Sequence, residues 1–384
     1  MVSEPYPRPR FAEFFCGGGL VRAALQAHWD CVFANDIDPM KAAVYTQNWG
    51  EAALRVGDIA DLQIGAIPPH VDLYWASSPC QDFSLAGKGR GLSGARSGVF
   101  REWVRLLAAA AEQGTAPRII AFENVTGLLT RNEGRDGRAV FNALTNLGYR
   151  VGALEVDAAA FVPQSRPRMF LVGVAEDVLI APLKAAGPQG PFHSAKVLRF
   201  HESLPRNLAR HWIWWAHHAP RVEVPSLADI LDPQPDTPWL AHADVARLLS
   251  LMSAPSQNRV AAARQLGAPV VGMLYKRGRP DASGQNRQRA EVRFDGLAGC
   301  LRTPAGGSSR QTVLIVEGKR TRARLLSSLE AARLMGLPDS YQMPTSYNQA
   351  YKVAGDGVAV PVVRYLDQAL FQPLLRADRQ RAVA

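Results

Sequence analysis

Short apolar runs alternate with helix-like periodicity along the first 175 residues of this 384-residue chain. The apolar runs at 10–15, 71–77, 118–122, 149–156 and 169–174 predict β-strands, and another strand is predicted to end at Asn35 and Asp36. Helical periodicity occupies residues 21–27, 39–48 and 100–113. Strands that alternate with helices predict an α/β domain with a mostly parallel, helix-covered sheet.

The pattern changes after about residue 175. Prolines recur, six of the eight histidines lie between His193 and His242, and the periodic signals become short and irregular. Regular periodicity returns at residues 325–335 and 358–375. We therefore expect a first domain at 1–174, a smaller, loop-rich inserted domain at 175–322, and a segment at 323–384 that completes the first domain.

The charge balance is basic, with 44 Lys and Arg against 34 Asp and Glu, a net charge of +10 and a pI near 9.7. A basic chain favours a polyanionic partner such as nucleic acid. Hydrophobic residues make up 47% and charged residues 20% of the chain, which excludes a disordered or fibrous protein.

Cysteine usage and the N-terminus bear on location. The four cysteines form no CxxC pair and no zinc pattern, so we expect reduced thiols, a cytoplasmic protein and no metal. The first ten residues lack the apolar segment of a signal peptide. No run approaches 18 consecutive apolar residues, so no membrane span is expected.

Three glycines, Gly17 to Gly19, separate a predicted strand from a predicted helix. Glycines let the backbone approach a ligand closely, and a helix N-terminus offers free N–H groups. Asp36 ends the next strand, where an acid can bind ribose hydroxyls. The alternative is that Asp36 or Asp38 caps the following helix, and these features alone do not separate the two interpretations.

Three further motifs end or begin predicted strands. Cys80, in Ser78-Pro79-Cys80-Gln81, precedes a basic glycine-rich loop and could be a nucleophile or an inert thiol. Glu123 ends another strand, where a carboxyl group could act as an acid, a hydrogen-bond donor or a helix cap. Arg166 and Arg168 share one strand face and could hold acidic groups or a base edge, or remain exposed.

The order and combination of these motifs resemble those of DNA cytosine-5 methyltransferases. The family order is carried by Pro79-Cys80-Gln81, Glu123-Asn124-Val125, Gln164-x-Arg166-x-Arg168, an irregular insert, the block from Arg324 to Asp339, and Gly355-Asp356-Gly357-Val358. The resemblance spans nearly the whole chain. It implies a Rossmann-like, S-adenosylmethionine-dependent methyltransferase domain with an inserted target recognition domain.

The resemblance implies catalytic roles for Cys80, Glu123, Arg166 and Arg168. Cys80 would attack carbon 6 of cytosine, because carbon 5 is a poor nucleophile until a covalent adduct gives it enamine character. Glu123 would bind N3 and the exocyclic amine, Arg168 would contact O2, and Arg166 would support the site. Loss of the carbon-5 proton would then release Cys80.

The implied cofactor is S-adenosylmethionine, seated over the glycine turn. Asp36 would hold the ribose and Ile37 would cover the adenine face, while further residues would contact the adenine edge or line the methionine end. The complete implied set is Phe15, Gly17, Gly19, Asp36, Ile37, Asp58, Ile59, Pro79 and Val99.

The implied substrate is a cytosine flipped out of double-stranded DNA, at a cost of a few kcal/mol. The loop at 84–96 would close over it, and the implied DNA contacts are Gln81, Ser84, Arg96 and Gln164. Residues 259–310 carry ten Lys or Arg against three acids. Such a segment suits phosphate and groove contacts, or it is a solvated basic face.

The sequence departs from the family pattern at three places. The glycine turn continues with Leu20 where many members have a further glycine, Asp356 replaces a common Asn, and Cys300 lies roughly where Thr is usual. Asp356 adds a negative charge near the expected cofactor. The aromatic segment at 211–218 lacks convincing metal-ligand spacing, and we expect it to pack in the small domain, with a DNA or partner surface as the alternative.

The implied function is methylation of carbon 5 of cytosine in a specific duplex sequence, by a monomer that could accompany a cognate restriction endonuclease. Three rivals remain: a tRNA or other RNA cytosine-5 methyltransferase, a catalytically silent DNA-binding regulator, and a nicotinamide oxidoreductase. The oxidoreductase would leave Cys80 and its neighbours unexplained. Amino-group DNA methyltransferases are disfavoured, since no Asp-Pro-Pro-Tyr-like tetrapeptide occurs.

Overall fold

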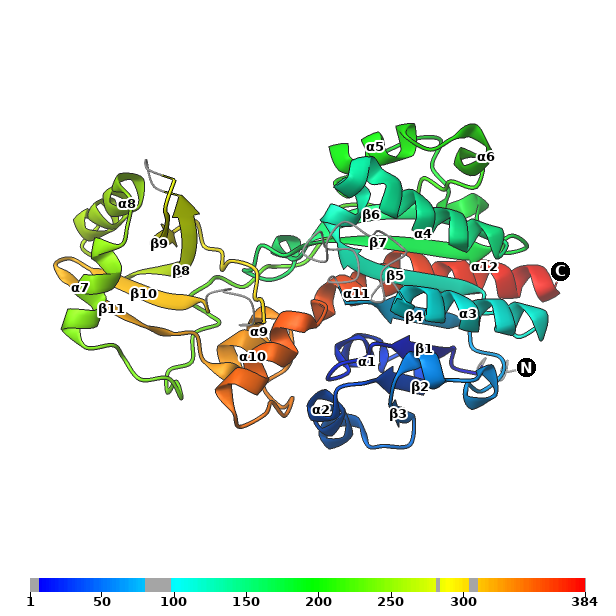
Figure 1. The fold of residues 1–384 in the computed structure, drawn as a ribbon, viewed down its shortest axis with the longest axis horizontal. Helices are drawn as coiled ribbons and strands as arrows, with labels where there is room; N and C mark the ends of the chain where they lie inside the picture. The colour runs from blue at the N-terminus through cyan, green and yellow to red at the C-terminus, as the bar shows by residue number, and fades with distance from the viewer. Residues whose placement is uncertain (1–6, 80–97, 281–283, 304–309, 384) are drawn as a thin grey trace, which may run out of the picture. The chain divides into compact units, whose positions relative to one another are not determined.

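The computed structural model describes residues 7–79, 98–280, 284–303 and 310–383, which form two compact units (Figure 1). The first unit contains residues 1–156, 167–221 and 362–384, and the second contains 157–166 and 222–361. These boundaries differ from 1–174, 175–322 and 323–384, so the division by function stays a prediction.

A seven-stranded sheet with the order β3-β2-β1-β4-β5-β7-β6 forms the centre of the first unit. Neighbours from β3 to β5 run parallel, and β7 runs antiparallel to β5. The mostly parallel sheet predicted from the sequence is therefore confirmed. The strands are β1 (Arg10–Phe14), β2 (Asp30–Asp36), β3 (Leu54–Val56), β4 (Leu73–Ser77), β5 (Ile119–Val125), β6 (Tyr149–Asp157) and β7 (Pro167–Ala175).

Helices cover this sheet, because β4 and β5 are apolar and buried along almost their whole length. The predicted helices at 21–27, 39–48 and 100–113 are confirmed within a few residues. The α-helices are α1 (Leu20–Leu25), α2 (Pro39–Trp49), α3 (Gly98–Glu112), α4 (Arg135–Asn146), α5 (Ala195–Glu202), α6 (Arg206–Ala209), α11 (Val360–Leu366) and α12 (Gln372–Val383), with a π-helical turn at Asp367–Phe371.

The aromatic segment at 211–218 packs in the first unit, so the expectation that it packs in the small domain is wrong. Trp212 is 7% exposed and stacks on Phe141 of α4, with ring centroids 5.5 Å apart. A parallel bridge also joins Trp212 to Val151 of β6. The segment therefore extends the core of the large sheet.

The second unit is built on a four-stranded antiparallel sheet with the order β11-β10-β8-β9. Its strands are β8 (Val270–Pro280), β9 (Asn286–Arg293), β10 (Thr312–Glu317) and β11 (Arg320–Leu325), and its helices are α7 (His242–Ser250), α8 (Ala254–Gln265), α9 (Ser328–Leu334) and α10 (Tyr347–Asp356). The sequence pattern predicted a loop-rich insert without this sheet. The predicted helix at 325–335 begins later, at Ser328, because Leu325 still pairs in β11.

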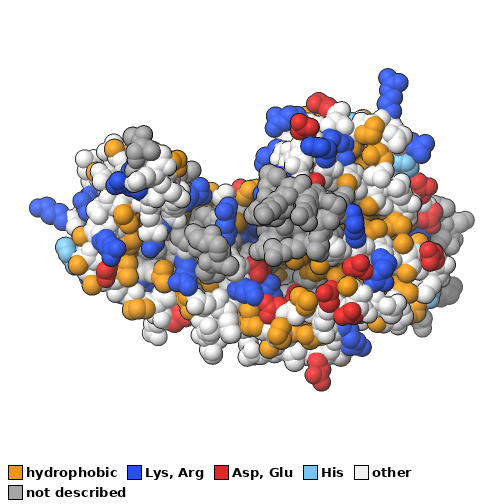
Figure 2. All heavy atoms as spheres, viewed as in Figure 1, with side chains coloured by type: hydrophobic (Ala, Val, Ile, Leu, Met, Phe, Trp, Pro, Cys, Tyr) orange, Lys and Arg blue, Asp and Glu red, His pale blue; other side chains and the backbone are white. Residues whose placement is uncertain are grey.

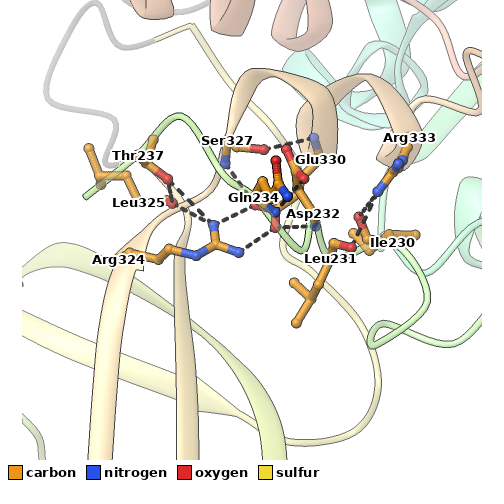
Figure 3. A network of polar contacts seen from close by, with 10 residues as sticks. All are labelled: Ile230, Leu231, Asp232, Gln234, Thr237, Arg324, Leu325, Ser327, Glu330 and Arg333. Atoms are coloured by element: carbon orange, nitrogen blue, oxygen red, sulfur yellow. Dashed lines mark hydrogen bonds and ion pairs between the residues drawn. The ribbon is translucent and has the colours of Figure 1, made fainter. Parts of the chain in front are cut away.

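A buried polar network joins β11 to α9 and to the chain at 230–237 (Figure 3). Arg324 donates to Glu330, and the Glu330 carboxylate also accepts the backbone N–H groups of Ser327 and Asp232, at 2.8 and 2.9 Å. Ser327 and Glu330 form a capping box at the start of α9. Thr237 donates to the Leu325 carbonyl at 2.8 Å. The same network therefore holds the chain at 230–237 against β11 and α9.

Among the described residues, no helix combines the length and the apolarity that a membrane crossing needs. No group of three or more His, Cys, Asp or Glu side chains within these ranges is arranged to hold a metal ion.

Candidate active site

The carboxyl ends of β4 and β5 lie side by side, since Ser77 is in register with Glu123. Asn124, the next residue of β5, and Ser78, the first residue after β4, strengthen this connection. Asn124 donates from Nδ2 to the carbonyl oxygen and the hydroxyl of Ser78, at 3.2 and 3.1 Å. The chain leading into residue 80 is therefore tied to the end of the strand that carries Glu123.

Glu123 and Arg168 face each other across the antiparallel pair of β5 and β7. Their atoms Oε1 and Nε lie 3.2 Å apart, and the side chains are only 9% and 16% exposed. Arg168 also donates to the Pro167 carbonyl at 3.0 Å. Such a pair offers a carboxyl group and a guanidinium to one small planar ligand, in surroundings with little water.

Arg166 has a different environment, inside the second unit. Its guanidinium donates to the carbonyl of Leu301 at 2.8 Å and to those of Gly355 and Gly357 at 2.8 and 2.6 Å. The side chain is 2% exposed. Arg166 thereby holds residues 301 and 355–357 together, which fits a supporting role and not a direct contact with a ligand.

Gln164 is fully buried in the same unit. Its Nε2 donates to the Leu334 carbonyl at 2.8 Å, and its Oε1 accepts the Leu301 backbone N–H at 3.1 Å. Because both ends of the amide bind backbone, a contact with DNA would require the side chain to leave these partners.

Cys300 and Asp356, two residues that depart from the family pattern, lie beside the segments that Arg166 holds together. The thiol of Cys300 lies 3.4 Å from Nη1 of Arg166. Asp356 accepts a hydrogen bond from the hydroxyl of Thr303. A Cβ at Gly355 would be 2.9 Å from the backbone of Arg302 and Thr303, so these segments pack with no room for a side chain.

A glycine turn connects β1 to α1 on a left-handed backbone. Phe15, Gly17 and Gly19 have φ values of 58°, 54° and 78°. The Gly17 N–H donates to Oδ2 of Asp36, and the Asp38 N–H donates to Oδ1, both at 2.8 Å. Asp38, not Asp36, caps α2, so the two acids have separate uses.

Asp36 retains the capacity to bind a ligand, because each carboxylate oxygen has a second lone pair. Beside it, Ile37 and Val56 are 63% and 56% exposed, and Val56 is in register with Asp36. Exposed aliphatic side chains next to a carboxylate and a glycine turn fit an adenosine-like ligand with an apolar base and a hydroxylated sugar. Val56 was not singled out from the sequence.

Asn35 holds the neighbouring turn at 55–57, and the sequence did not single it out as a site residue. Its Nδ2 donates to the carbonyls of Arg55 and Gly57, at 2.9 and 3.0 Å. Asp58 is exposed and accepts the Ala60 N–H at 2.9 Å, whereas the side chain of Ile59 is 3% exposed and belongs to the core. A ligand at this edge could use Asp58 and the backbone of Ile59.

The remaining predicted site residues are placed only in part. Pro79 is exposed, and Val99 in α3 is half-buried against the core. Cys80, Gln81, Ser84 and Arg96 lie outside the described residues.

Burial around the glycine turn perturbs two titratable groups. It raises the pKa of the Glu13 carboxyl to about 8, and the nearby Arg22 partly opposes that shift. It also raises the pKa of the Cys16 thiol well above its usual range, because desolvation acts together with the nearby Glu13 and Asp36 carboxylates. Cys16 is therefore an inert core thiol and not a nucleophile.

Strands β8 and β9 form a basic ribbon, which we define as 276–280 paired with 286–290. Residues 277, 278, 280 and 286–288 are exposed, and Arg277 lies opposite Arg289. Like charges directly opposite each other destabilise a strand pair, and Glu291, 4.0 Å from Arg277, offsets part of that repulsion. A bound polyanion would offset it further. In the face drawn in Figure 2, Lys and Arg side chains are dispersed among hydrophobic and uncharged ones.

Comparison with known proteins gives a consistent result. A family model described as C-5 cytosine-specific DNA methylase matches residues 9–372. The chain is 26% identical over 365 residues to Type II methyltransferase M.NlaX of Neisseria lactamica, covering 94% of this chain and 96% of that protein. It is 27% identical over 360 residues to Type II methyltransferase M.HhaI of Haemophilus parahaemolyticus, covering 93% and 92%.

Solved structures share the fold. The S. pombe Dnmt2 methyltransferase aligns with a TM-score of 0.58 and 18% identity, covering 96% of this chain and 99% of that one. The Entamoeba histolytica methyltransferase EhMeth aligns with a TM-score of 0.57 and 14% identity, over the same shares of both chains.

Proposed function

The chain belongs to the C-5 cytosine-specific DNA methylase family, and from that premise we propose that it transfers a methyl group from S-adenosylmethionine to carbon 5 of cytosine in a specific duplex DNA sequence. The observation that carries the proposal is the ion pair of Glu123 and Arg168, beside a strand end whose chain continues to Cys80.

The proposed reaction begins with the Cys80 thiolate. Its sulfur forms a bond to carbon 6 of the base, and the electron pair of the 5,6 double bond moves into the ring, which makes carbon 5 nucleophilic. Glu123 binds N3 and the exocyclic amine, and Arg168 contacts O2. After carbon 5 has accepted the methyl group, its proton passes to a base. The electron pair of that carbon–hydrogen bond re-forms the 5,6 double bond, and the carbon-6–sulfur bond breaks with its electron pair returning to the Cys80 sulfur as thiolate.

The residues around the glycine turn would hold S-adenosylmethionine, which supplies an electrophilic methyl group when bound. Asp36 would accept from the ribose hydroxyls, Ile37 would cover the adenine face, and Asp58 with the Ile59 backbone would meet its edge. Pro79 and Val99 would line the methionine end. The left-handed turn at Phe15, Gly17 and Gly19 supports this proposal, since Phe15 and Gly17 are only partly buried and a Cβ at Gly17 would have no neighbour closer than 3.9 Å.

The basic ribbon of β8 and β9 is proposed to contact the DNA. A two-stranded ribbon has the width that the major groove admits, and Arg287 and Gln288 are exposed there. Gln81, Ser84 and Arg96 are proposed to contact the strand around the flipped base. We assign sequence recognition to the insert at 175–322, which contains this ribbon.

The wider setting follows from the type II relatives. We propose that the enzyme protects a DNA site, either for a cognate restriction endonuclease or alone. We also propose that the enzyme acts as a monomer. Chromosomal DNA as substrate favours a cytoplasmic location.

Bisulfite sequencing of unmethylated plasmid DNA tests the proposal. The purified chain and S-adenosylmethionine are expected to protect the cytosines of one short motif. Cys80→Ala is expected to lose that protection, while the matched Cys31→Ala, which removes a half-buried thiol of β2, retains it. No protected duplex motif would overturn the proposal; tRNA methylation would then identify an RNA enzyme, and DNA binding without methylation would identify a silent regulator.

A further inference from the structure

The indole of Trp49, the last residue of α2, reaches the glycine turn. Its Nε1 donates to the carbonyl oxygen of Gly18 at 3.1 Å. Gly18 is buried, so this contact satisfies a carbonyl with little access to water. The side chain of a residue 31 positions along the chain thus fixes the centre of the turn.

The turn also lies in direct contact with the indole. A Cβ at Gly19 would be 2.5 Å from Nε1 and 2.7 Å from Cδ1 of Trp49, and 2.9 Å from Cδ2 of Tyr45. Real Cβ atoms do not approach other atoms so closely. The backbone of Gly19 therefore packs on the ring with no space between them.

Arg22 of α1 contacts the rings of both Trp49 and Tyr45. Its guanidinium carbon lies 5.6 Å from the centroid of Trp49 and 5.5 Å from that of Tyr45, and Nη1 donates to the Tyr45 hydroxyl at 2.9 Å. These cation–π contacts and the hydrogen bond leave the indole little freedom to turn. The donor to Gly18 is therefore held in one orientation.

We propose that Trp49 is a positioning residue for the cofactor: it acts through the Gly18 carbonyl to hold the glycine turn in the conformation that S-adenosylmethionine requires. This inference rests on the proposed function, since it concerns the same site. Without the indole N–H, the turn populates other conformations, and the ligand must select the competent one, which weakens its apparent affinity.

The test measures binding of S-adenosylhomocysteine by calorimetry, without turnover. Trp49→Phe is expected to raise the dissociation constant about 3- to 10-fold, the effect of one lost hydrogen bond. The KM for S-adenosylmethionine should rise similarly, while kcat at saturating cofactor and the KM for DNA stay within twofold. Benzothienylalanine at position 49 keeps the shape of the ring, lacks only the N–H, and is expected to weaken binding to the same degree.

Trp29→Phe is the matched control. The Trp29 indole is 1% exposed and donates to Oδ1 of Asp367 at 2.7 Å, with its ring edge-to-face on Phe11 and Phe371. This variant also loses one indole hydrogen bond, so its melting temperature is expected to fall while its affinity for S-adenosylhomocysteine stays unchanged.

Two results would overturn the inference while leaving the proposed function in place. One is wild-type affinity for S-adenosylhomocysteine in Trp49→Phe and in the benzothienylalanine variant. The other is an equal loss of affinity in Trp49→Phe and Trp29→Phe, which would indicate a general structural role. Failure of the wild-type chain itself to bind S-adenosylhomocysteine would overturn the proposed function together with this inference.

Discussion

Nη1 of Arg324 donates to Oε2 of Glu330 over 2.7 Å, and the two residues are only 1% and 0% exposed. Burial by itself raises the pKa of Glu330, but the hydrogen bonds from Arg324, Ser327 and Asp232 together outweigh burial and lower the pKa below its usual value. The charge of Glu330 is therefore stabilised by its partners and not by water. Removing one partner would leave an uncompensated buried charge.

Arg324→Met is predicted to destabilise the second unit by about 3–5 kcal/mol, because Glu330 then loses its cation in a dry site. Urea unfolding measures the change in the free energy of unfolding, with hydrogen exchange of the β10 and β11 amides as the probe of the second unit. Arg293→Met is the matched control: Arg293 pairs with Asp295 on the surface of the same unit, at 27% and 56% exposure. That variant is expected to cost less than about 1 kcal/mol. Equal costs for the two variants would contradict the prediction.

Glu123→Gln is predicted to lower kcat about 10²- to 10⁴-fold with little change in DNA affinity. The amide keeps the size of the side chain but loses the charge paired with Arg168, and with it the group proposed to bind N3 and the amino group of cytosine. Single-turnover methylation and a DNA mobility assay separate the two effects.

Glu155→Gln provides the control for that experiment. Glu155 is also a partly buried carboxylate of the first unit, 2.5 Å from Nζ of Lys196, and no step of the reaction is assigned to it. Its methylation rate is expected to remain near wild type. A Glu123→Gln enzyme as active as the Glu155→Gln enzyme would remove Glu123 from the catalytic set.

Most strands of the first unit could be predicted because they are buried and read as apolar runs. β3, with two of its three residues exposed, was not predicted. β4 and β5 are of this kind, and the motifs at their carboxyl ends supplied the candidate site residues Cys80 and Glu123. Parallel strands bring their carboxyl ends to one edge of a sheet, and the order of the motifs along the chain, through its resemblance to the family, grouped Cys80 with Glu123.

The sheet of the second unit could not be predicted in the same way. β9 begins with three exposed residues and becomes alternately buried only near Ala290 and Val292, so the chain shows neither an apolar run nor a clear alternation. Long-range contacts were equally hidden. Nothing in the sequence connects Arg166 to the carbonyls of Leu301 and Gly355, or Trp49 to that of Gly18, because backbone acceptors carry no residue signature.

Glu13→Gln is predicted to flatten the pH dependence of stability between about pH 4.5 and 8. Burial raises the pKa of Glu13 to about 8 in the folded chain, so the unfolded chain releases the proton first as the pH rises. Wild-type stability should therefore fall across that window by about 1.4 kcal/mol per pH unit from this group. Glutamine is neutral throughout and avoids that loss.

Urea unfolding at pH 5 and pH 8 measures the difference. Relative to wild type, Glu13→Gln is expected to gain stability on going from pH 5 to pH 8. Parallel pH profiles for the two proteins would mean that Glu13 ionises in the folded chain as readily as in the unfolded one.

His217 should give the opposite dependence. Its ring is 4% exposed, stacked on Phe192 at 5.2 Å and 4.7 Å from the ring of His193. Burial, with smaller effects from His193 and His218, lowers its pKa to about 4. The unfolded chain takes up this proton first as the pH falls, so stability is complete above about pH 6.5 and is lost between there and pH 4, by about 1.4 kcal/mol per unit.

His217→Leu is predicted to unfold at nearly the wild-type urea concentration at pH 7.5 and at a higher one at pH 5. Neither ring nitrogen of His217 has a hydrogen-bond partner among the described residues, so the apolar side chain sacrifices no such contact at neutral pH. His218→Leu, which removes the exposed neighbouring ring, is expected to follow the wild-type profile at both pH values. If His217→Leu lost as much stability as wild type between pH 7.5 and pH 5, the acid sensitivity of this unit would have to come from groups other than the buried imidazole, because leucine cannot bind a proton.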